Sequence, residues 1–242
     1  MTDIEQLHQW IDASNNIVFF GGAGVSTESN IPDFRSDNGL YKKQYRYPAE
    51  QMISHSFFLS NPEEFYEFYF NQMIFPDAQP NAAHKALAKL EKMGKLKAIV
   101  TQNIDGLHQK AGSKVVYELH GSVLKNTCMH CHAHYDLEQT IAARDEKGIP
   151  RCPKCGNIIK PNVVLYEEGL DEGTIYAAVD AIEKADLLIV GGTSLVVYPA
   201  AGLIRYFRGK HLVLINRDAT PMDDQADLVI HDSIGKVLSN AI

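Results

Sequence analysis

The stretch Ile17-Val-Phe-Phe-Gly-Gly-Ala-Gly-Val-Ser-Thr27 joins an apolar run to a glycine-rich turn. The run predicts a buried strand, because a strand covered on both faces needs continuous rather than alternating hydrophobicity. Gly22 and Gly24 would let the backbone turn tightly and approach a pyrophosphate at a following helix N-terminus. The match to the dinucleotide-binding pattern is incomplete, because Thr27 stands where a third glycine is usual. A plain glycine turn is the alternative for this motif taken alone.

The rest of the chain alternates between short apolar runs and segments with helical periodicity. Further strands are expected at Ala98–Thr101, Val115–Leu119, Leu187–Val190, Leu212–Ile215 and Leu228–Ile230. Helices are expected at Asn81–Met93, Thr174–Ala185 and Pro199–Phe207. This alternation predicts an α/β fold, a Rossmann-like doubly wound parallel sheet.

Composition narrows the function classes. The 242 residues carry 23 Lys and Arg against 30 Asp and Glu, a net charge of −7, which argues against holding nucleic acid by neutralising phosphates. The chain starts without a basic, apolar leader, and no apolar run approaches the ~18 residues of a membrane helix. We therefore expect a soluble, cytoplasmic protein with no direct nucleic-acid or membrane partner.

Two segments interrupt the alternation. Residues 36–80 are rich in aromatic residues, with Pro62 opening a helical run, and residues 122–160 hold all four cysteines. We expect a Rossmann-like domain made of residues 1–35, 81–121 and 161–242. A helical insertion (36–80) and a cysteine module (122–160) would form a smaller domain, with the ligand in the cleft between the two.

The cysteines form two pairs with metal-ligand spacing, Cys128-Met-His-Cys131 and Cys152-Pro-Lys-Cys155. In a reducing compartment this layout favours metal over disulfides. Four thiolates can surround Zn²⁺ tetrahedrally and leave no open position for water, so the zinc would be structural. Three nearby histidines could compete as ligands, but we expect them to face solvent: His130, His132 and His134.

Polar residues follow several of the predicted strands. Thr101-Gln-Asn-Ile-Asp105 offers donors and acceptors suited to a carboxamide and a ribose, although Asn103 or Asp105 could equally cap a helix. His120 ends the strand Val115–Leu119, where an imidazole with an ordinary pKa near ~6.5 could act as a general base. It is one of ten histidines, and most histidines are structural or solvated.

Three more segments could contact a ligand. The loop Ser29-Asn-Ile-Pro-Asp-Phe-Arg-Ser36 contains Pro32, which restricts the backbone so that Phe34 and Arg35 are presented at defined angles. Taken alone, a solvated loop is the simpler interpretation. Gly191-Gly-Thr-Ser194 and Asn216 each follow a strand and could bind a phosphate and a ribose, or form ordinary turns.

Together these residues resemble the sirtuin family of NAD-dependent protein-lysine deacylases, in the bacterial form with a single catalytic core. The matching segments run in family order from Gly22 to Asn216: Gly-Ala-Gly-Val-Ser, Ile-Pro-Asp-Phe-Arg, Thr-Gln-Asn-Ile-Asp, Glu-Leu-His-Gly, both cysteine pairs and Gly-Thr-Ser-Leu. The resemblance implies an enzyme that consumes NAD as co-substrate and carries a structural zinc. Its partners would be acyl-lysine proteins or peptides.

The resemblance also assigns residues. His120 would be the catalytic base, with Asn103 as a second catalytic residue, and Cys128, Cys131, Cys152 and Cys155 would bind zinc. The implied cofactor-binding residues are Gly22, Ala23, Gly24, Thr27, Phe34, Arg35, Gln102, Asn103, Ile104, Asp105, Gly192, Thr193, Ser194 and Asn216. The implied substrate-binding residues, which would pair with an extended peptide and line an acyl-lysine channel, are Val163, Val164, Leu165 and Tyr166.

The implied reaction cleaves nicotinamide from NAD and transfers the acyl group from lysine to ADP-ribose, giving O-acyl-ADP-ribose. Relatives that remove acidic acyl groups carry a Tyr-x-x-Arg pair, whereas here Gln72 follows Tyr69 at the third position, so we expect a preference for uncharged acyl groups. Asn30 and Glu167 stand where the family usually has glycine, and Glu167 adds a negative charge beside the peptide groove.

Three other functions are compatible with parts of this pattern. A mono-ADP-ribosyltransferase would use the same NAD cleavage, and an NAD-dependent dehydrogenase would use the same Rossmann-like body. A zinc-ribbon nucleic-acid-binding module would use the cysteines alone. The missing third glycine weakens the dehydrogenase, and the net charge of −7 weakens the nucleic-acid module.

Overall fold

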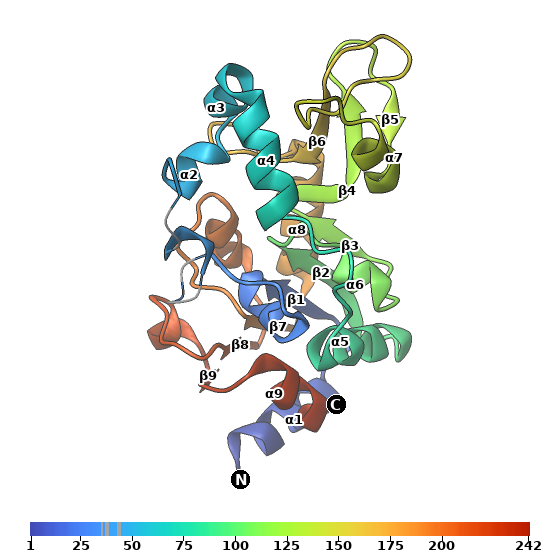
Figure 1. Ribbon diagram of the computed structural model, residues 1–242. Coiled ribbons are helices and arrows are strands. Elements are labelled where there is room, and N and C mark those ends of the chain that lie inside the picture. The colour runs from blue at the N-terminus through green and yellow to red at the C-terminus, as the bar shows by residue number, and fades with distance from the viewer. Residues whose placement is uncertain (35, 37–38, 43–44) are drawn as a thin grey trace.

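The computed structural model describes residues 1–34, 36, 39–42 and 45–242. Its body is a six-stranded sheet in the order β3-β2-β1-β7-β8-β9, in which every strand pair is parallel (Figure 1). The strands are β1 (Ile17–Gly21), β2 (Leu96–Thr101), β3 (Val116–Glu118), β7 (Leu187–Gly191), β8 (His211–Ile215) and β9 (Leu228–Ile230). Numbered within this sheet alone the order is 3-2-1-4-5-6, the doubly wound order, and it reverses between β1 and β7.

Helices cover both faces of this sheet, which explains the continuous apolar strands. Ile17 and Phe19 of β1 pack in a core that includes residues of α1 (Asp3–Ala13), α5 (Ala82–Lys92) and α9 (Ile234–Ala241). Val18 and Phe20 pack in the opposite core, with α8 (Glu172–Lys184) and the 3-10 helix η4 (Ala200–Tyr206). Because successive side chains of a strand point to opposite faces, both sets must be apolar.

A smaller antiparallel sheet lies beside the body, in the order β5-β4-β6. Its strands are β4 (Gly121–Cys128), β5 (His134–Tyr135) and β6 (Ile159–Val163), with α7 (Leu137–Ala142) after β5. Helices α2 (Ala49–Met52), α3 (His55–Ser60) and α4 (Pro62–Gln72) stand next to this sheet at the same end of the body (Figure 1). The aromatic side chains of α3 and α4 share one buried cluster with Val123, Val163 and Leu165.

Shorter helices complete the described chain. They are α6 (Leu107–Lys110) and the 3-10 helices η1 (Ala23–Val25), η2 (Thr27–Ser29), η3 (Leu40–Lys42) and η5 (Asp223–Gln225). Within the described ranges, no helix combines the length and the apolar character needed to cross a membrane.

The structure confirms the expected fold class and all six expected strands of the large sheet. Pro62 occupies the start of α4, as predicted, and Asn81 caps α5 through its side chain. The expected helix at Pro199–Phe207 forms as a 3-10 helix over Ala200–Tyr206. Over seven residues, repeats of 3.0 and 3.6 bury nearly the same positions, so the hydrophobic pattern does not distinguish the two helix types. Of the four residues expected to pair with a peptide, Val163–Tyr166, only Val163 belongs to a strand, because β6 ends there.

The division into a Rossmann-like domain and two insertions stays a prediction. Strand β6 spans the expected boundary between residues 160 and 161, since it runs over Ile159–Val163 and pairs with β4 in the small sheet. We propose that the boundary falls within or just after this strand.

Candidate active site between the parallel sheet and the zinc module

A cleft of about 770 Å³ separates the large sheet from the small one and its helical neighbours. It is lined by the loops after β1, β2, β7 and β8, by His120 and by the segment that follows β6. Of the predicted cofactor, catalytic and substrate residues that the structure describes, all line this cleft except Thr27. Arg35 lies outside the described residues.

The glycine turns after β1 and β7 meet backbone to backbone at the point where the strand order reverses. Gly24 N donates to Gly192 O at 2.8 Å, and Gly192 itself has a φ of +61°. A Cβ on Gly24 would lie 2.8 Å from the Gly192 Cα, and one on Gly22 would lie 2.8 Å from the Thr193 Cβ. Only glycine allows this approach, which leaves a bare backbone lining suited to a pyrophosphate.

Thr27 stabilises the glycine turn after β1 from outside the cleft. Its Oγ1 donates to Gly24 O at 3.0 Å, so the hydroxyl closes the turn, and the side chain is not among those lining the cleft.

Three polar side chains meet at the floor of the cleft. Ser26 Oγ donates to Asp105 Oδ2 at 2.6 Å, and Asn103 Nδ2 donates to Ser26 Oγ at 3.1 Å. The other carboxylate oxygen of Asp105 accepts from Leu107 N at 2.9 Å. Asp105 therefore satisfies a free N–H group at the start of α6 and also lines the cleft.

Ser26 was not among the predicted site residues. It is buried, with 1% of its surface exposed, and it connects the glycine turn to the loop after β2. The signal was present in the sequence, because Ser26 closes the Gly21-Gly-Ala-Gly-Val-Ser segment, but its partners lie 77 and 79 residues away.

His120 stands at the junction of the two sheets, directly between β3 and β4. Its Nδ1 lies 2.9 Å from Gln102 O, and since a carbonyl only accepts, Nδ1 must carry the proton. Nε2 then keeps its lone pair. Burial lowers the pKa of His120, and the hydrogen bond to Gln102 O partly offsets that effect. The imidazole is therefore neutral near pH 7 and able to accept a proton.

Local geometry and contacts hold the turn at Asn30, which precedes Phe34, and several of the remaining predicted cofactor residues. Asn30 takes the left-handed conformation, with a φ of 62°, so the turn persists without glycine. The Phe34 ring packs 5.4 Å from that of Tyr41. Gln102 Nε2 donates to Thr193 Oγ1 at 3.1 Å and thereby joins the loops after β2 and β7. Asn216 Nδ2 donates to Asp218 O at 2.8 Å.

The predicted substrate segment runs from β6 along the rim of the cleft. Val163 pairs with Gly121, and Val164 N donates to His120 O at 2.9 Å, which places this segment beside the histidine. Val163 and Leu165 are buried in the aromatic cluster of the helical insertion. Tyr166 is partly exposed, and its hydroxyl lies 2.8 Å from the hydroxyl of Tyr41.

The C-terminal end of α4 borders the cleft. Tyr45 Oη donates to Gln72 Oε1 at 3.1 Å, and Gln72 lines the cleft together with Met73 and Ile74. The third position after Tyr69 thus carries Gln72, a neutral side chain.

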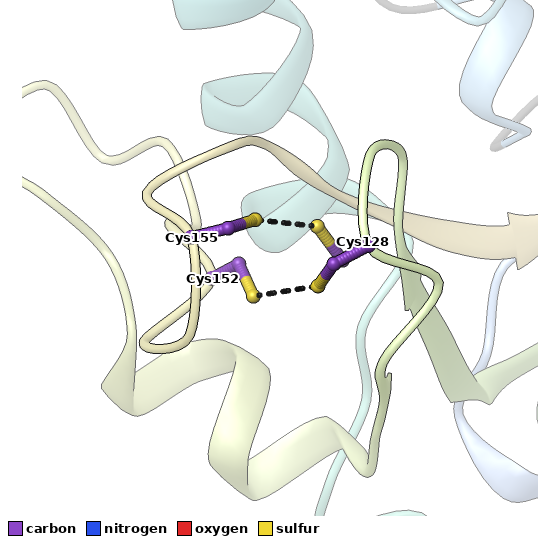
Figure 2. A group of neighbouring side chains, drawn as sticks. Cys128, Cys152 and Cys155 are labelled. Atoms are coloured by element: carbon purple, nitrogen blue, oxygen red, sulfur yellow. Dashed lines mark hydrogen bonds between the residues drawn. The ribbon is translucent and has the colours of Figure 1, made fainter.

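The four cysteines lie apart from the cleft at the tip of the small sheet. Cys128 ends β4, and the side chains converge on one point, as Figure 2 shows for Cys128, Cys152 and Cys155. The four sulfur atoms all lie within 4.8 Å of one another, and the Cys128–Cys155 and Cys131–Cys152 sulfurs are 3.4 and 3.5 Å apart. Four thiolates at ~2.3 Å from a tetrahedral Zn²⁺ would be about 3.8 Å apart.

This arrangement fits a structural zinc and supplies a complete ligand set. The nearby histidines His130, His132 and His134 are exposed, as expected. A zinc ion held here would take no part in the chemistry of the cleft, because four thiolates leave no open coordination position.

The fold and the site define a class: a Rossmann-like nucleotide-binding body with a four-cysteine zinc module, and between the large and small sheets a cleft with a mainly apolar lining and a few polar side chains. Comparison with known proteins identifies the family. The chain belongs to the Sir2 family, whose model matches residues 22–199.

Curated relatives are similar over the full length. The chain is 65% identical over 241 residues to a protein of Clostridium acetobutylicum and 65% identical over 242 residues to one of Clostridium perfringens. In both cases 99% of this chain and 98% of the relative are covered, and both relatives are named NAD-dependent protein deacetylase.

Solved structures share the fold. One, described as the structural basis for the mechanism and regulation of Sir2 enzymes, gives a TM-score of 0.90 at 41% identity, covering 99% of this chain and 96% of the other. A second, of a Sir2 protein with a deacetylated p53 peptide and 3'-O-acetyl ADP-ribose, gives a TM-score of 0.90 at 40% identity, covering 99% and 97%.

Proposed function

We propose that this NAD-dependent protein deacetylase removes uncharged acyl groups from lysine side chains and transfers them to ADP-ribose, with His120 as the base. The observation that carries the proposal is the position of His120. Its Nδ1 is held by Gln102 O at 2.9 Å, and its own carbonyl accepts from Val164 N of the substrate segment. One residue thus joins the polar floor of the cleft to the rim where a peptide would lie.

The cofactor side of the cleft fits an extended NAD molecule. The bare backbone of Gly22 and Gly24 suits the pyrophosphate, and the donors and acceptors of Asn103 and Asp105 suit the carboxamide and the nearby ribose. Gly192, Thr193, Ser194 and Asn216 are the proposed adenosine-side residues, with Ala23, Phe34, Gln102 and Ile104 completing the set. NAD supplies a glycosidic bond whose cleavage activates the sugar. Thr27 contributes by closing the glycine turn, and Arg35 is proposed from the sequence alone.

The chain's own residues prepare the cleft for this chemistry. An electron-poor sugar centre needs a site that excludes water, and Ile31, Phe34 and Ile104 supply apolar lining. The neutral Nε2 of His120 accepts a proton from a ribose hydroxyl, which increases the nucleophilicity of that oxygen. We assign Asn103 the second catalytic role because its amide, fixed by Ser26, borders the same space.

The substrate side fits an acylated lysine in an extended peptide. The segment Val163, Val164, Leu165 and Tyr166 runs along the rim, where an extended peptide would lie beside it. The N–H groups of Val164, Leu165 and Tyr166 are already bonded within the chain. The buried Val163 and Leu165 would line the channel for the acyl-lysine stem. Solved relatives have been described with an acetylated and with a propionylated peptide. Because Gln72 is neutral, an acidic acyl group would find no paired cation there.

Product analysis with a panel of peptides tests the proposal. The protein is incubated with NAD and peptides carrying acetyl-, propionyl- or succinyl-lysine, and products are identified by mass spectrometry. We expect free nicotinamide, deacylated peptide and O-acyl-ADP-ribose from the first two peptides and at least tenfold less from the third. ADP-ribose attached to protein would instead indicate an ADP-ribosyltransferase, and NADH would indicate a dehydrogenase.

A further inference from the structure

Glu167 directly follows the proposed substrate segment and lines the cleft. Its φ is +76°, in the left-handed region that residues other than glycine and asparagine rarely adopt. The residue is exposed. Glu167 therefore presents a carboxylate at the rim of the cleft even though its left-handed backbone conformation is unfavourable.

The side chain of Glu167 is held in one place by helix α3. Ser56 N donates to Oε2 at 2.8 Å, and Ser56 Oγ donates to Oε1 at 2.9 Å. The backbone on the N-terminal side is fixed too, because Tyr166 N donates to Ile53 O at 3.1 Å and Tyr166 O accepts from His55 N at 2.9 Å. The carboxylate is thus anchored next to the groove.

The two adjacent carboxylates differ in how their charge is balanced. Glu168 lies 3.1 Å from Lys160 Nζ and 2.8 Å from His55 Nδ1, and it accepts from Leu165 N. Among the residues that the structure describes, no Lys, Arg or His forms an ion pair with Glu167. Its donors are the neutral hydroxyl and N–H of Ser56, which position the charge without cancelling it.

We propose that Glu167 is a specificity-determining residue that favours acyl-lysine peptides with a lysine or arginine beside the acylated residue. This inference rests on the proposed substrate groove. An acylated lysine is itself neutral, so the charge of a substrate near the groove comes from its flanking residues. An exposed charge pair of this kind changes affinity by about two- to fivefold, and salt screens it.

Equilibrium binding of labelled acetyl-lysine peptides tests this. Three peptides differ only in whether arginine, alanine or glutamate flanks the acetyl-lysine, and fluorescence anisotropy gives their Kd values without requiring turnover. Glu167→Gln removes the charge, and its amide oxygen can still accept from Ser56. The matched control is Glu183→Gln, an equal charge change at an exposed position of α8 outside the cleft lining.

In the wild type and in Glu183→Gln we expect the arginine peptide to bind about two- to fivefold more tightly than the alanine peptide, and the glutamate peptide more weakly. In Glu167→Gln the three Kd values converge, as they do for the wild type at ~1 M salt. Glu167→Gly, which relieves the left-handed strain, should give the same convergence, and circular dichroism checks that each variant is folded.

An unchanged ratio of Kd values in both Glu167 variants would overturn the inference. So would equal binding of all three peptides by the wild type. If the wild type binds the alanine peptide in these cases, the proposed deacetylase function stands and only the role of Glu167 falls. If none of the peptides binds, the proposed groove fails with it.

Discussion

In the parallel sheet, β1 and β7 bury all of their residues, and helices pack on both faces. In the zinc module, β5 is two residues long. The buried cluster around the cysteines of this module consists of Cys128, Cys152 and Ile159. The first region has enough apolar surface to fold by burial. The second has too little, and its four cysteines are arranged to hold a structural zinc, which would stabilise the module in place of a hydrophobic core.

The difference teaches where each region is vulnerable. Apolar packing is spread over many side chains, so the body has no single residue on which its fold depends. Metal coordination is concentrated in four sulfur atoms, so the fold of the module depends on each of the four cysteines. The candidate active-site cleft lies between the two and borders both, because β6 leads from the zinc end to the proposed substrate segment.

The largest expected effect is loss of the metal. Cys128→Ser removes one of four thiolates, and since structural zinc contributes roughly 10–16 kcal/mol in small zinc domains, the module should lose zinc and unfold. Metal analysis and hydrogen exchange measure this: protection should disappear in β4 and β6 and persist in β1 and β7. Wild-type protein treated with a chelator is the control. Stoichiometric zinc in the variant, or loss of protection in β1, would contradict the comparison.

The next effect concerns His120, which stands between the two regions. His120→Ala should lower kcat for deacetylation by about 10²–10⁴, the usual range for a general base. Zinc content and thermal unfolding should match the wild type. Because burial lowers the pKa of His120 below its ordinary value near 6.5, wild-type activity should fall only at pH values below that. Near wild-type turnover by the variant would show that another group is the base.

Acid should weaken the body through a buried pair of histidines. His84 and His108 are 0% and 1% exposed, and burial lowers their pKa values to about 4 and about 3. As the pH falls from 6.5 toward 4 the unfolded chain binds protons that the folded chain does not, so the free energy of unfolding falls. The slope is up to about 1.4 kcal/mol per pH unit for each histidine.

Urea unfolding at several pH values checks this, monitored by the fluorescence of Trp10, the single tryptophan. Trp10 lies in α1 and packs on the apolar core of the body, so it reports that region. His108→Phe should give a shallower pH dependence than the wild type. The same slope in both proteins would show that the pair does not cause the acid sensitivity.

The smallest effects concern the contact between the zinc module and α4. Lys147 Nζ lies 3.4 Å from Glu63 Oε2, but both side chains are more than half exposed, so Glu63→Ala should change the free energy of unfolding by less than about 0.5 kcal/mol. The matched variant Tyr66→Phe removes a buried hydrogen bond to Ile159 O and should cost about 1–3 kcal/mol. Denaturant titration compares the two, and a larger loss from Glu63→Ala would reverse this ranking.

Much of the fold could be predicted because its signals are local. Phe19 and Phe20 are adjacent and both apolar, which requires a sheet covered on two faces, and the cysteine spacing alone indicated four metal ligands. The meeting of Ser26, Asn103 and Asp105 could not be derived, because their contacts join segments nearly 80 residues apart. The contact of Ser56 with Glu167 spans 111 residues. Such pairs depend on how loops are brought together, which hydrophobic periodicity does not encode.

Helices α1 and α9 lie side by side at the end of the molecule opposite the zinc module (Figure 1), where His8 Nδ1 contacts Ala241 O at 3.0 Å. A tether fused to either helix would therefore anchor the protein to a sensor surface by the end that lies opposite the zinc module. Peptide capture could then be followed in real time on immobilised enzyme, with no part of the support near the groove.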